Sequence, residues 1–196
     1  MKLELKHLAP YLPYGLNIDT SYWDDEPSPI GKNIISEMTQ DDVICSYGWA
    51  STHGRMIQQE YSIDRIKPIL RPLSDLTKDI EHNGEKFVAL VKLYETAYYG
   101  IFKYVTPYKI NFIDQEDNSL GLVVRDEDEE RNGFTLNFPT DHYNWFEFRL
   151  TLDNENLSHN MTLNQFQLFE KLFEWHFDVF GLIEKGLAID INTINP

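Results

Sequence analysis

Apolar residues dominate residues 162–186, and the polar positions of this stretch form one narrow line. On a helix of 3.6 residues per turn, alternating steps of three and four residues stay on one face. The non-apolar positions follow such steps: Asn164, Gln167, Lys171, Glu174, Asp178, Gly181 and Lys185. Large apolar side chains cover most of the remaining circumference. The pattern therefore predicts a largely buried C-terminal helix over about residues 162–186.

Both ends of this predicted helix carry local signals. Thr162 is placed to act as the N-cap, and the Gln165 side chain is placed to reach back to the Thr162 backbone N–H. Gly186 suits the left-handed residue that follows a helix, because it has no side chain to clash. Leu187 would then pack over Leu182 as in a Schellman motif. We expect the helix to stop at Gly186.

A hairpin and a second helix are predicted in the middle of the chain. Asn83-Gly84 is a favoured type I′ turn, so residues 77–82 are expected to pair with residues 85–90. Apolar residues then recur at spacings of three and four and predict a helix over about residues 90–104: Leu90, Leu93, Tyr94, Ala97, Tyr98, Ile101 and Phe102.

Most of the other apolar segments have the pattern of short strands. Residues 146–152 are the clearest case, because apolar and polar side chains alternate strictly. The predicted strands cover residues 16–19, 33–38, 43–47, 55–61, 109–113, 120–125, 133–138 and 146–152. Gly48 and Gly54 are expected to separate strands, and Pro68 and Pro72 to break any ladder. Because these elements form no repeated βαβ units, we predict an α+β fold with antiparallel sheet packed on the C-terminal helix.

Length and composition predict a single domain over residues 1–196. The chain has 196 residues, 42% of them hydrophobic, which suffices for a core without disulfides or metal. The single cysteine, Cys45, excludes an intramolecular disulfide and fits a reducing compartment. No apolar run approaches the roughly 18 residues that span a bilayer. We therefore expect a cytoplasmic protein with no membrane partner.

The formal net charge of −15 narrows the class of partner. Direct binding of nucleic acid is disfavoured, since gripping phosphates needs clustered lysine and arginine. Two interpretations stay open: an acidic surface that keeps the protein in solution, or a surface that mimics nucleic acid and occupies a basic groove of another protein.

Catalytic and cofactor motifs are absent from the sequence, which has no Walker loop, GxGxxG, HExxH or GxSxG. On the predicted helix, His176 lies opposite Glu174 and Asp178, so these three residues cannot form one metal site. We interpret His176 as a histidine that donates to a backbone carbonyl, with a functional role as the alternative. Cys45 has the surroundings of a buried strand residue. We assign no catalytic, cofactor-binding or metal-binding residue.

Two further histidines, His53 and His142, stand in loop-like surroundings. Either could approach carboxylates only through a tertiary arrangement that the sequence does not specify. Three tryptophans, Trp23, Trp49 and Trp145, are expected in exposed loops, where aromatic side chains would favour contact with a partner.

Three blocks of sequence support a resemblance. KHLAPYLPYGL at residues 6–16, IKPILRPLSDLTKDIEHNGEKFV at 66–88 and LFEWHFDVFGLIEKGLAIDINT at 172–193 resemble recurrent blocks of an uncharacterised family of short phage- and prophage-associated proteins from Bacteroidota. The resemblance implies an accessory protein carried by a phage or mobile element, in the host cytoplasm. It supplies no activity, cofactor or catalytic residue.

The favoured hypothesis is a non-enzymatic, acidic phage or prophage accessory protein that acts by binding a protein partner. Two alternatives stay open. One is a minor structural or assembly component of a virion, which would require self-association or a large apolar patch. The other is an enzyme with an unfamiliar site around His176, Glu174 or His53.

Overall fold

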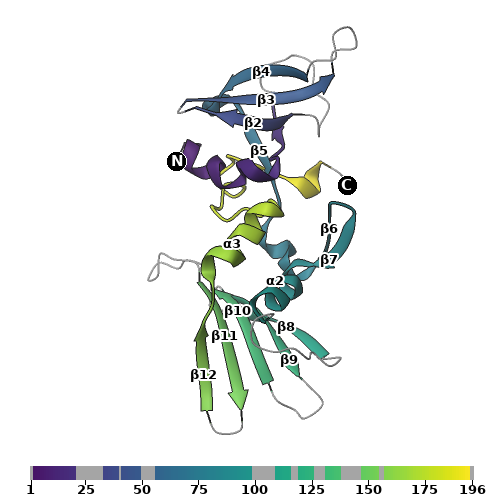
Figure 1. Cartoon of the computed structure of the whole chain (residues 1–196), viewed down its shortest axis with the longest axis vertical. Coiled ribbons are helices and arrows are strands. Elements are labelled where there is room, and N and C mark those ends of the chain that lie inside the picture. Colours follow the sequence, from purple (N-terminus) through teal and green to yellow (C-terminus); the bar gives the residue numbers. More distant parts are fainter. Residues whose placement is uncertain are drawn as a thin grey trace. The chain divides into compact units, whose positions relative to one another are not determined.

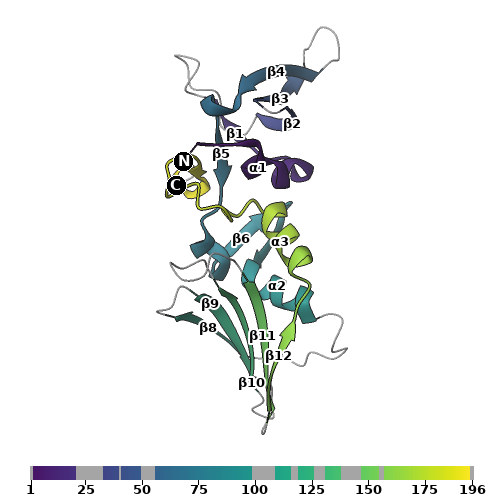
Figure 2. The same cartoon turned by 90° about the vertical axis from the view of Figure 1, so that its left-hand side faces the viewer.

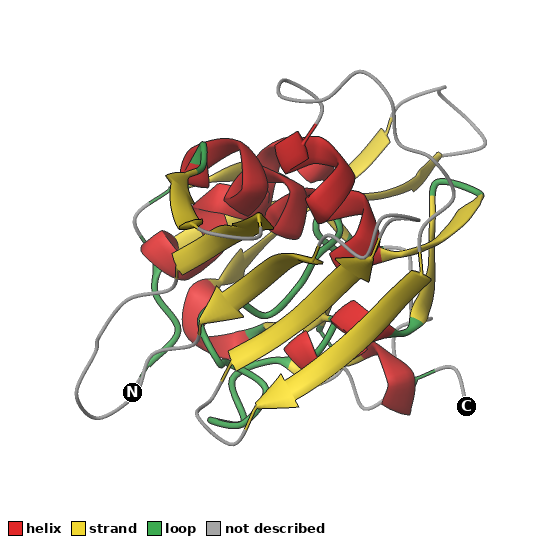
Figure 3. Ribbon diagram, turned by 90° about the horizontal axis from the view of Figure 1, so that it is seen from below, coloured by secondary structure: helices red, strands yellow, loops and turns green. Residues whose placement is uncertain are grey.

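The fold is seen in a computed structural model, which describes residues 2–20, 33–39, 41–49, 56–98, 109–115, 119–125, 131–137, 147–154 and 157–194 (Figure 1). The chain divides into two compact units. The first unit is Met1–Leu73 with Glu170–Pro196, and the second unit is Ser74–Phe169. Helices and mostly antiparallel strands occur in the chain, which confirms the α+β class (Figure 3). The single domain stays a prediction, since two compact units can belong to one domain or to two.

The first unit contains two three-stranded sheets (Figure 2). Strands β2, β3 and β4 form an antiparallel sheet in that order, and β5 lies between β1 and β13 in the other. The elements are α1 (Leu5–Leu8), η1 (Ala9–Tyr14), β1 (Ile18–Asp19), β2 (Ile34–Met38), β3 (Asp42–Trp49), β4 (Met56–Ser62), η2 (Ile63–Arg65), β5 (Lys67–Leu70), β13 (Ile189–Asp190) and η4 (Ile191–Thr193). The four strands predicted before residue 62 are confirmed, β1 in shortened form.

Two breaks expected in this unit do not occur. Pro68 lies buried inside β5, where it pairs with Ile18 of β1. A proline lacks only the N–H, and the ladder continues because Ile69 N–H donates to the Asn17 carbonyl at 2.9 Å. Gly48 lies within β3, at a register shift between Tyr47 and Trp49, so it marks a bulge and not the end of a strand.

The core of the first unit joins the N-terminal helical turns to both of its sheets. Seven of its described residues are completely inaccessible: Leu8, Tyr11, Leu16, Val43, Cys45, Leu70 and Leu182. Burial of one such leucine contributes about 1.5–3 kcal/mol. Cys45 of β3 is fully buried in the same cluster, which confirms its predicted place. No helix in the described ranges is long and apolar enough to cross a membrane.

The second unit is built on a five-stranded antiparallel meander with the order β12-β11-β10-β9-β8 (Figure 1). The strands are β8 (Lys109–Gln115), β9 (Ser119–Arg125), β10 (Arg131–Asn137), β11 (Glu147–Asn154) and β12 (Leu157–Thr162). The first four confirm predicted strands, whereas β12 lacks regular alternation and was missed. The unit also contains η3 (Leu73–Thr77, whose first residue belongs to the first unit), β6 (Asp79–His82), β7 (Glu85–Val88) and α2 (Ala89–Tyr98).

Aromatic side chains connect α2 to this sheet. Tyr94 of α2 meets Phe134 of β10 edge to face at 5.9 Å, and Phe134 stacks on Phe148 of β11 at 5.6 Å. Phe148 in turn meets Phe169 edge to face at 5.3 Å. Such pairs contribute about 0.5–1.5 kcal/mol each beyond their buried area. Leu90, Leu93 and Tyr94 are buried, as the predicted apolar face requires. The part of that helix predicted beyond Tyr98 lies outside the described residues.

The hairpin and its turn are confirmed, although its arms are shorter than the predicted 77–82 and 85–90. Asn83 and Gly84 have φ of 51° and 81°, the positive values that a type I′ turn requires at both central positions. His82 pairs with Glu85 directly across the turn, and the ladder extends to Asp79 and Val88.

The C-terminal helix is much shorter than predicted. Helix α3 is Gln165–Glu174, so the predicted helix over residues 162–186 is wrong at both ends. Thr162 is the last residue of β12 and not the N-cap. Asn164 takes that role, because its Oδ1 accepts from the Gln167 N–H at 3.3 Å. The Gln165 side chain instead bonds the N–H and C=O of Phe148 at 2.8 and 2.7 Å.

The helix also buries less than predicted. Phe166 is 72% exposed, although the pattern assigned it to the buried face. Leu168 and Leu172, one helical turn apart, are buried and form the inward stripe. A stripe of this width is typical of an amphipathic helix at the edge of a core, not of a helix surrounded by neighbours.

Candidate functional site

The end of α3 and the segment after it contain Glu174, His176 and Asp178, which the sequence analysis considered as a possible site. Arg71, which follows β5, holds this segment in place. Arg71 N–H donates to the His176 carbonyl and Asp178 N–H donates to the Arg71 carbonyl, both at 2.8 Å. These bonds form a parallel bridge between Arg71 and Phe177. Residues in such a bridge are extended, so α3 cannot continue through them.

His176 ends the helix in the left-handed conformation, with φ of 59°. His176 N–H donates to the Phe173 carbonyl at 3.0 Å and Phe177 N–H to the Leu172 carbonyl at 2.9 Å. This is the bonding pattern of a Schellman motif, with histidine where glycine is usual. The same pattern occurs at Gly186, where Leu187 N–H donates to the Leu182 carbonyl at 2.9 Å. The predicted motif at Gly186 is thus confirmed, but it closes a separate turn.

The His176 ring is used structurally. Its Nε2 lies 3.0 Å from the carbonyl oxygen of Tyr14, which can only accept, so Nε2 carries the hydrogen. The predicted donation to a backbone carbonyl is confirmed, although His176 does not lie on a helix. Nearby, the Glu174 carboxylate is paired with the Lys171 ammonium at 2.6 Å.

Asp178 is buried, which corrects its predicted place on the polar line. Only 4% of the residue is exposed, and its two carboxylate oxygens accept from the Leu182 and Ile183 N–H groups at 2.8 Å each. Burial raises the pKa of this carboxyl above its ordinary value, while the two N–H donors act in the opposite direction. The side chain therefore caps the turn that ends at Gly186.

Tyr11 completes this network from the N-terminal side. Its hydroxyl donates to the Phe177 carbonyl at 2.6 Å, and burial raises its pKa far above the usual value. Its ring meets Phe173 edge to face at 5.0 Å. Within the described ranges, no buried side-chain nitrogen or oxygen lacks a hydrogen-bond partner. Residues 175–178 thus have a structural role, in which their polar groups hold the backbone in place.

The other residues that the sequence analysis singled out are not seen in this hydrogen-bond network. His53, His142, Trp23 and Trp145 lie outside the described residues. Trp49 is the last residue of β3 and so does not lie in a loop. Burial raises the pKa of the Cys45 thiol to about 12, which leaves it protonated and poorly nucleophilic near neutral pH.

His7 was not singled out from the sequence, yet it is one of the buried polar residues. It is 2% exposed, and its Nδ1 accepts from the Glu4 N–H at 3.0 Å. Its ring meets Phe180 edge to face at 5.5 Å. The available signal was the spacing of Glu4 and His7, three residues apart as in a capping box, but this spacing alone is common.

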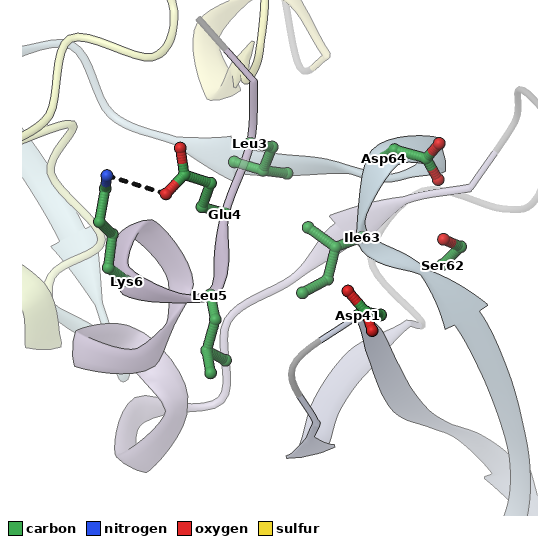
Figure 4. Close-up of a pocket in the computed structure, with 8 residues that line it drawn as sticks. All are labelled: Leu3, Glu4, Leu5, Lys6, Asp41, Ser62, Ile63 and Asp64. Carbon is green, nitrogen blue, oxygen red and sulfur yellow. Dashed lines mark ion pairs between the residues drawn. The ribbon is translucent and has the colours of Figure 1, made fainter.

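An open cavity of about 600 Å³ lies beside this N-terminal turn (Figure 4). One wall is the stretch from Leu3 to Lys6, and the other comes from Asp41, just before β3, and from Ser62 to Asp64, at the end of β4 and in η2. The lining residues are Leu3, Glu4, Leu5, Lys6, Asp41, Ser62, Ile63 and Asp64. Ile63 N–H donates to the Asp41 carbonyl at 2.8 Å and so fixes the second wall. Because three distant segments form the cavity, no local motif marked it.

The cavity lining is apolar in part and otherwise acidic. Leu3 and Ile63 are buried and Leu5 is partly buried, so they give the cavity an apolar surface. The lining contains three carboxylates, those of Glu4, Asp41 and Asp64, and one ammonium group, that of Lys6, which lies 2.8 Å from the Glu4 carboxylate. This contact lowers the pKa of Glu4.

The carboxylates of Asp41 and Asp64 lie on the wall opposite that pair (Figure 4). Neither aspartate side chain is bonded to another side chain of the part of the protein that the structure describes. In the same ranges, no group of three or more histidine, cysteine, aspartate or glutamate residues is arranged to hold a metal ion.

Comparison with known proteins does not assign the chain to a family. Of the three sequence blocks described above, residues 6–16 include the N-terminal helical turns beside the cavity, residues 66–88 run from β5 to β7, and residues 172–193 include the segment after α3. The resemblance itself stays a prediction. The chain matches no protein-family model, no curated protein and no solved structure.

Proposed function

We propose that the protein is a non-enzymatic binding protein whose cavity receives a lysine or arginine side chain from a basic segment of a protein partner. The observation that carries this proposal is the cavity lining, in which the carboxylates of Asp41 and Asp64, bonded to no other side chain of the described residues, stand beside an apolar surface. A lysine or arginine side chain is complementary to this lining, because its aliphatic stem suits the apolar surface and its charged head suits the carboxylates.

The two parts of the lining would act on different parts of the incoming side chain. Leu3, Leu5 and Ile63 would cover the aliphatic stem and remove its surface from water. Asp41 and Asp64 would accept hydrogen bonds from the charged head, and bonds between ionised groups are the stronger kind. Lys6 would not compete for these acceptors, because it is already paired with Glu4.

The charge of the whole chain supports the same class of partner. A formal net charge of −15 attracts basic surfaces over roughly a Debye length, about 10 Å at 0.1 M salt. It disfavours direct contact with nucleic acid phosphates. A basic protein surface, including one that otherwise binds nucleic acid, is the corresponding partner.

We also propose, from the three sequence blocks alone, that the protein serves a phage or mobile element as an accessory factor in the host cytoplasm. The genes that flank its coding sequence test this. Tail, replication or defence genes would support the proposal, and an invariant setting among housekeeping genes would contradict it.

A defined peptide tests the binding proposal. A fluorescent peptide of alternating arginine and glycine should bind the full chain, with an affinity that falls as salt screens the charges. A matched peptide with glutamine in place of arginine should not bind. Replacement of both cavity aspartates, Asp41→Asn with Asp64→Asn, should weaken binding by about tenfold or more, or about 1.4 kcal/mol, since both charged acceptors are lost.

The control removes the same amount of charge elsewhere. Asp79→Asn with Glu95→Gln neutralises two exposed carboxylates of the second unit. This variant should bind the arginine peptide almost as well as the wild type. Equal weakening by both double variants would show that the peptide responds only to net charge, and the cavity would lose its assigned role.

A further inference from the structure

We infer that His7 is a proton-sensitive latch that holds the N-terminal wall of the cavity at neutral pH and releases it in mild acid. The inference concerns the regulation of the proposed binding cavity, and to that extent it rests on the proposed function. The latch itself is defined by bonds within the first unit and can be tested without any ligand.

Two bonds between Glu4 and His7 close the first turn of α1. Glu4 N–H donates to His7 Nδ1 at 3.0 Å, and His7 N–H donates to the Glu4 carbonyl at 2.9 Å. Because Nδ1 accepts, it carries no hydrogen, and the neutral ring has its hydrogen on Nε2. Helix α1 has four residues, so few other helical bonds hold this turn.

Protonation of His7 is incompatible with the first of these bonds. The imidazolium ion carries a hydrogen on both ring nitrogens, so Nδ1 would face the Glu4 N–H as a second donor. His7 is also only 2% exposed, and its ring packs edge to face with Phe180, where a charge is poorly solvated. The charged ring must therefore leave its site or separate from the Glu4 backbone.

The groups around His7 determine the direction of its response. Burial, followed by the positive charge of Lys6, lowers the pKa of His7 below 6.5, and Lys185 adds to this effect. The Glu4 carboxylate acts in the opposite direction. The folded state thus binds the proton less readily than the unfolded state. The contribution of the neutral His7 ring to the free energy of unfolding is fully present above pH 6.5. It is lost as the pH falls below that value and through the lower folded-state pKa.

The latch lies in the cavity wall itself. Glu4, whose N–H donates to His7 Nδ1, lines the cavity together with its neighbours Leu3, Leu5 and Lys6. Release of the Glu4 backbone would loosen the apolar surface formed by Leu3 and Leu5.

Nuclear magnetic resonance measures the latch in the full chain without a ligand. Between about pH 7.5 and 5, the Glu4 amide signal should shift with the same midpoint as the His7 ring, and that midpoint should lie below 6.5. At neutral pH the nitrogen shifts of the ring should show an unprotonated Nδ1. A Glu4 amide that does not follow His7, or a protonated Nδ1 at neutral pH, would overturn the inference.

His7→Gln separates the latch from the binding proposal. Glutamine can accept from the Glu4 N–H as the third helical residue of a capping box, but it does not titrate. The variant should lose most of the change in thermal midpoint between about pH 7.5 and 5.5, whereas His82→Gln in the second unit should keep it. A wild-type pH response in His7→Gln would refute the latch.

Peptide binding then tests the regulatory step. The arginine peptide should bind wild type more weakly at about pH 5.5 than at 7.5, while His7→Gln should bind equally at both. A confirmed Glu4–His7 titration with no peptide binding at any pH would reject the proposed function and leave the latch intact. Binding that is insensitive to pH in both proteins would reject the regulation and keep the binding site.

Discussion

Asp178 shows how one buried side chain can replace a stretch of helix. Its two oxygens hold the Leu182 and Ile183 N–H groups, and its own N–H binds the Arg71 carbonyl. A helix would have satisfied these backbone groups within itself. Here the carboxylate satisfies them in a turn, so the chain can leave the helix without orphaned donors.

Asp178→Asn should therefore destabilise the fold. Asparagine has nearly the same shape but only one acceptor oxygen, so its NH₂ group would face one of the two N–H donors. A buried donor without a partner costs about 1–3 kcal/mol in the free energy of unfolding. Urea denaturation of wild type and variant measures this difference.

Asp190 provides the matched control for this prediction. Its Oδ1 accepts a single bond, from the Asn192 N–H at 2.9 Å, which an asparagine oxygen can also accept. Asp190→Asn should change the free energy of unfolding by less than about 0.5 kcal/mol. Similar losses in the two variants would mean that charge, and not the second acceptor, accounts for the effect at Asp178.

The end of α3 shows what the sequence could and could not predict about an element. Apolar spacing continues past Glu174, and Gly186 is a strong stop signal, so the local pattern favoured the longer helix. The bridge to Arg71 overrides this preference, but it joins residues about one hundred positions apart and has no local signature. The left-handed residue that ends α3 is also a histidine, and the usual sequence marker of such a residue is glycine.

Other elements were predictable because their signals are local. Asn83-Gly84 imposes positive φ on two adjacent residues, and strand alternation identified β11. The cavity was not predictable, since Leu3, Asp41 and Asp64 meet only through the packing of the first unit. His176 was correctly expected to bond a backbone carbonyl, because a partly buried ring nitrogen needs a partner wherever it lies.

The left-handed conformation at His176 predicts an unusual order of substitutions. Glycine adopts φ of 59° freely, whereas a β-branched side chain is strained there by about 1–2 kcal/mol. Both His176→Gly and His176→Val lose the bond to the Tyr14 carbonyl. The glycine variant should thus be the more stable of the two by about that amount, as measured by urea denaturation.

The same pair of substitutions at His82 should give the reverse order. His82 lies in β6, where valine is favoured over glycine by up to about 1 kcal/mol. A preference for glycine at both positions would point to a general effect of side-chain loss. A preference for valine at both would show that the backbone at His176 is not left-handed in solution.

At the scale of the whole molecule, excess negative charge opposes the folded state as well as attracting basic partners. Carboxylates outnumber basic groups by 32 to 17, and folding brings them closer together than they are in the unfolded chain. The surface ion pairs offset little of this repulsion, because water and salt screen exposed pairs such as Lys6–Glu4.

Salt should therefore stabilise the protein while it weakens the proposed binding. Raising sodium chloride from about 10 to 150 mM shortens the Debye length from about 30 to 8 Å, which screens repulsion among the carboxylates. The thermal midpoint followed by circular dichroism should rise with salt. The increase should be smaller for Asp79→Lys, because this substitution lowers the excess negative charge by two. Sucrose at equal osmolality controls for effects unrelated to charge. A midpoint that falls with salt would show that attractive ion pairs outweigh the repulsion. The charged surface would then stabilise the folded state, which contradicts the prediction that its excess negative charge destabilises it.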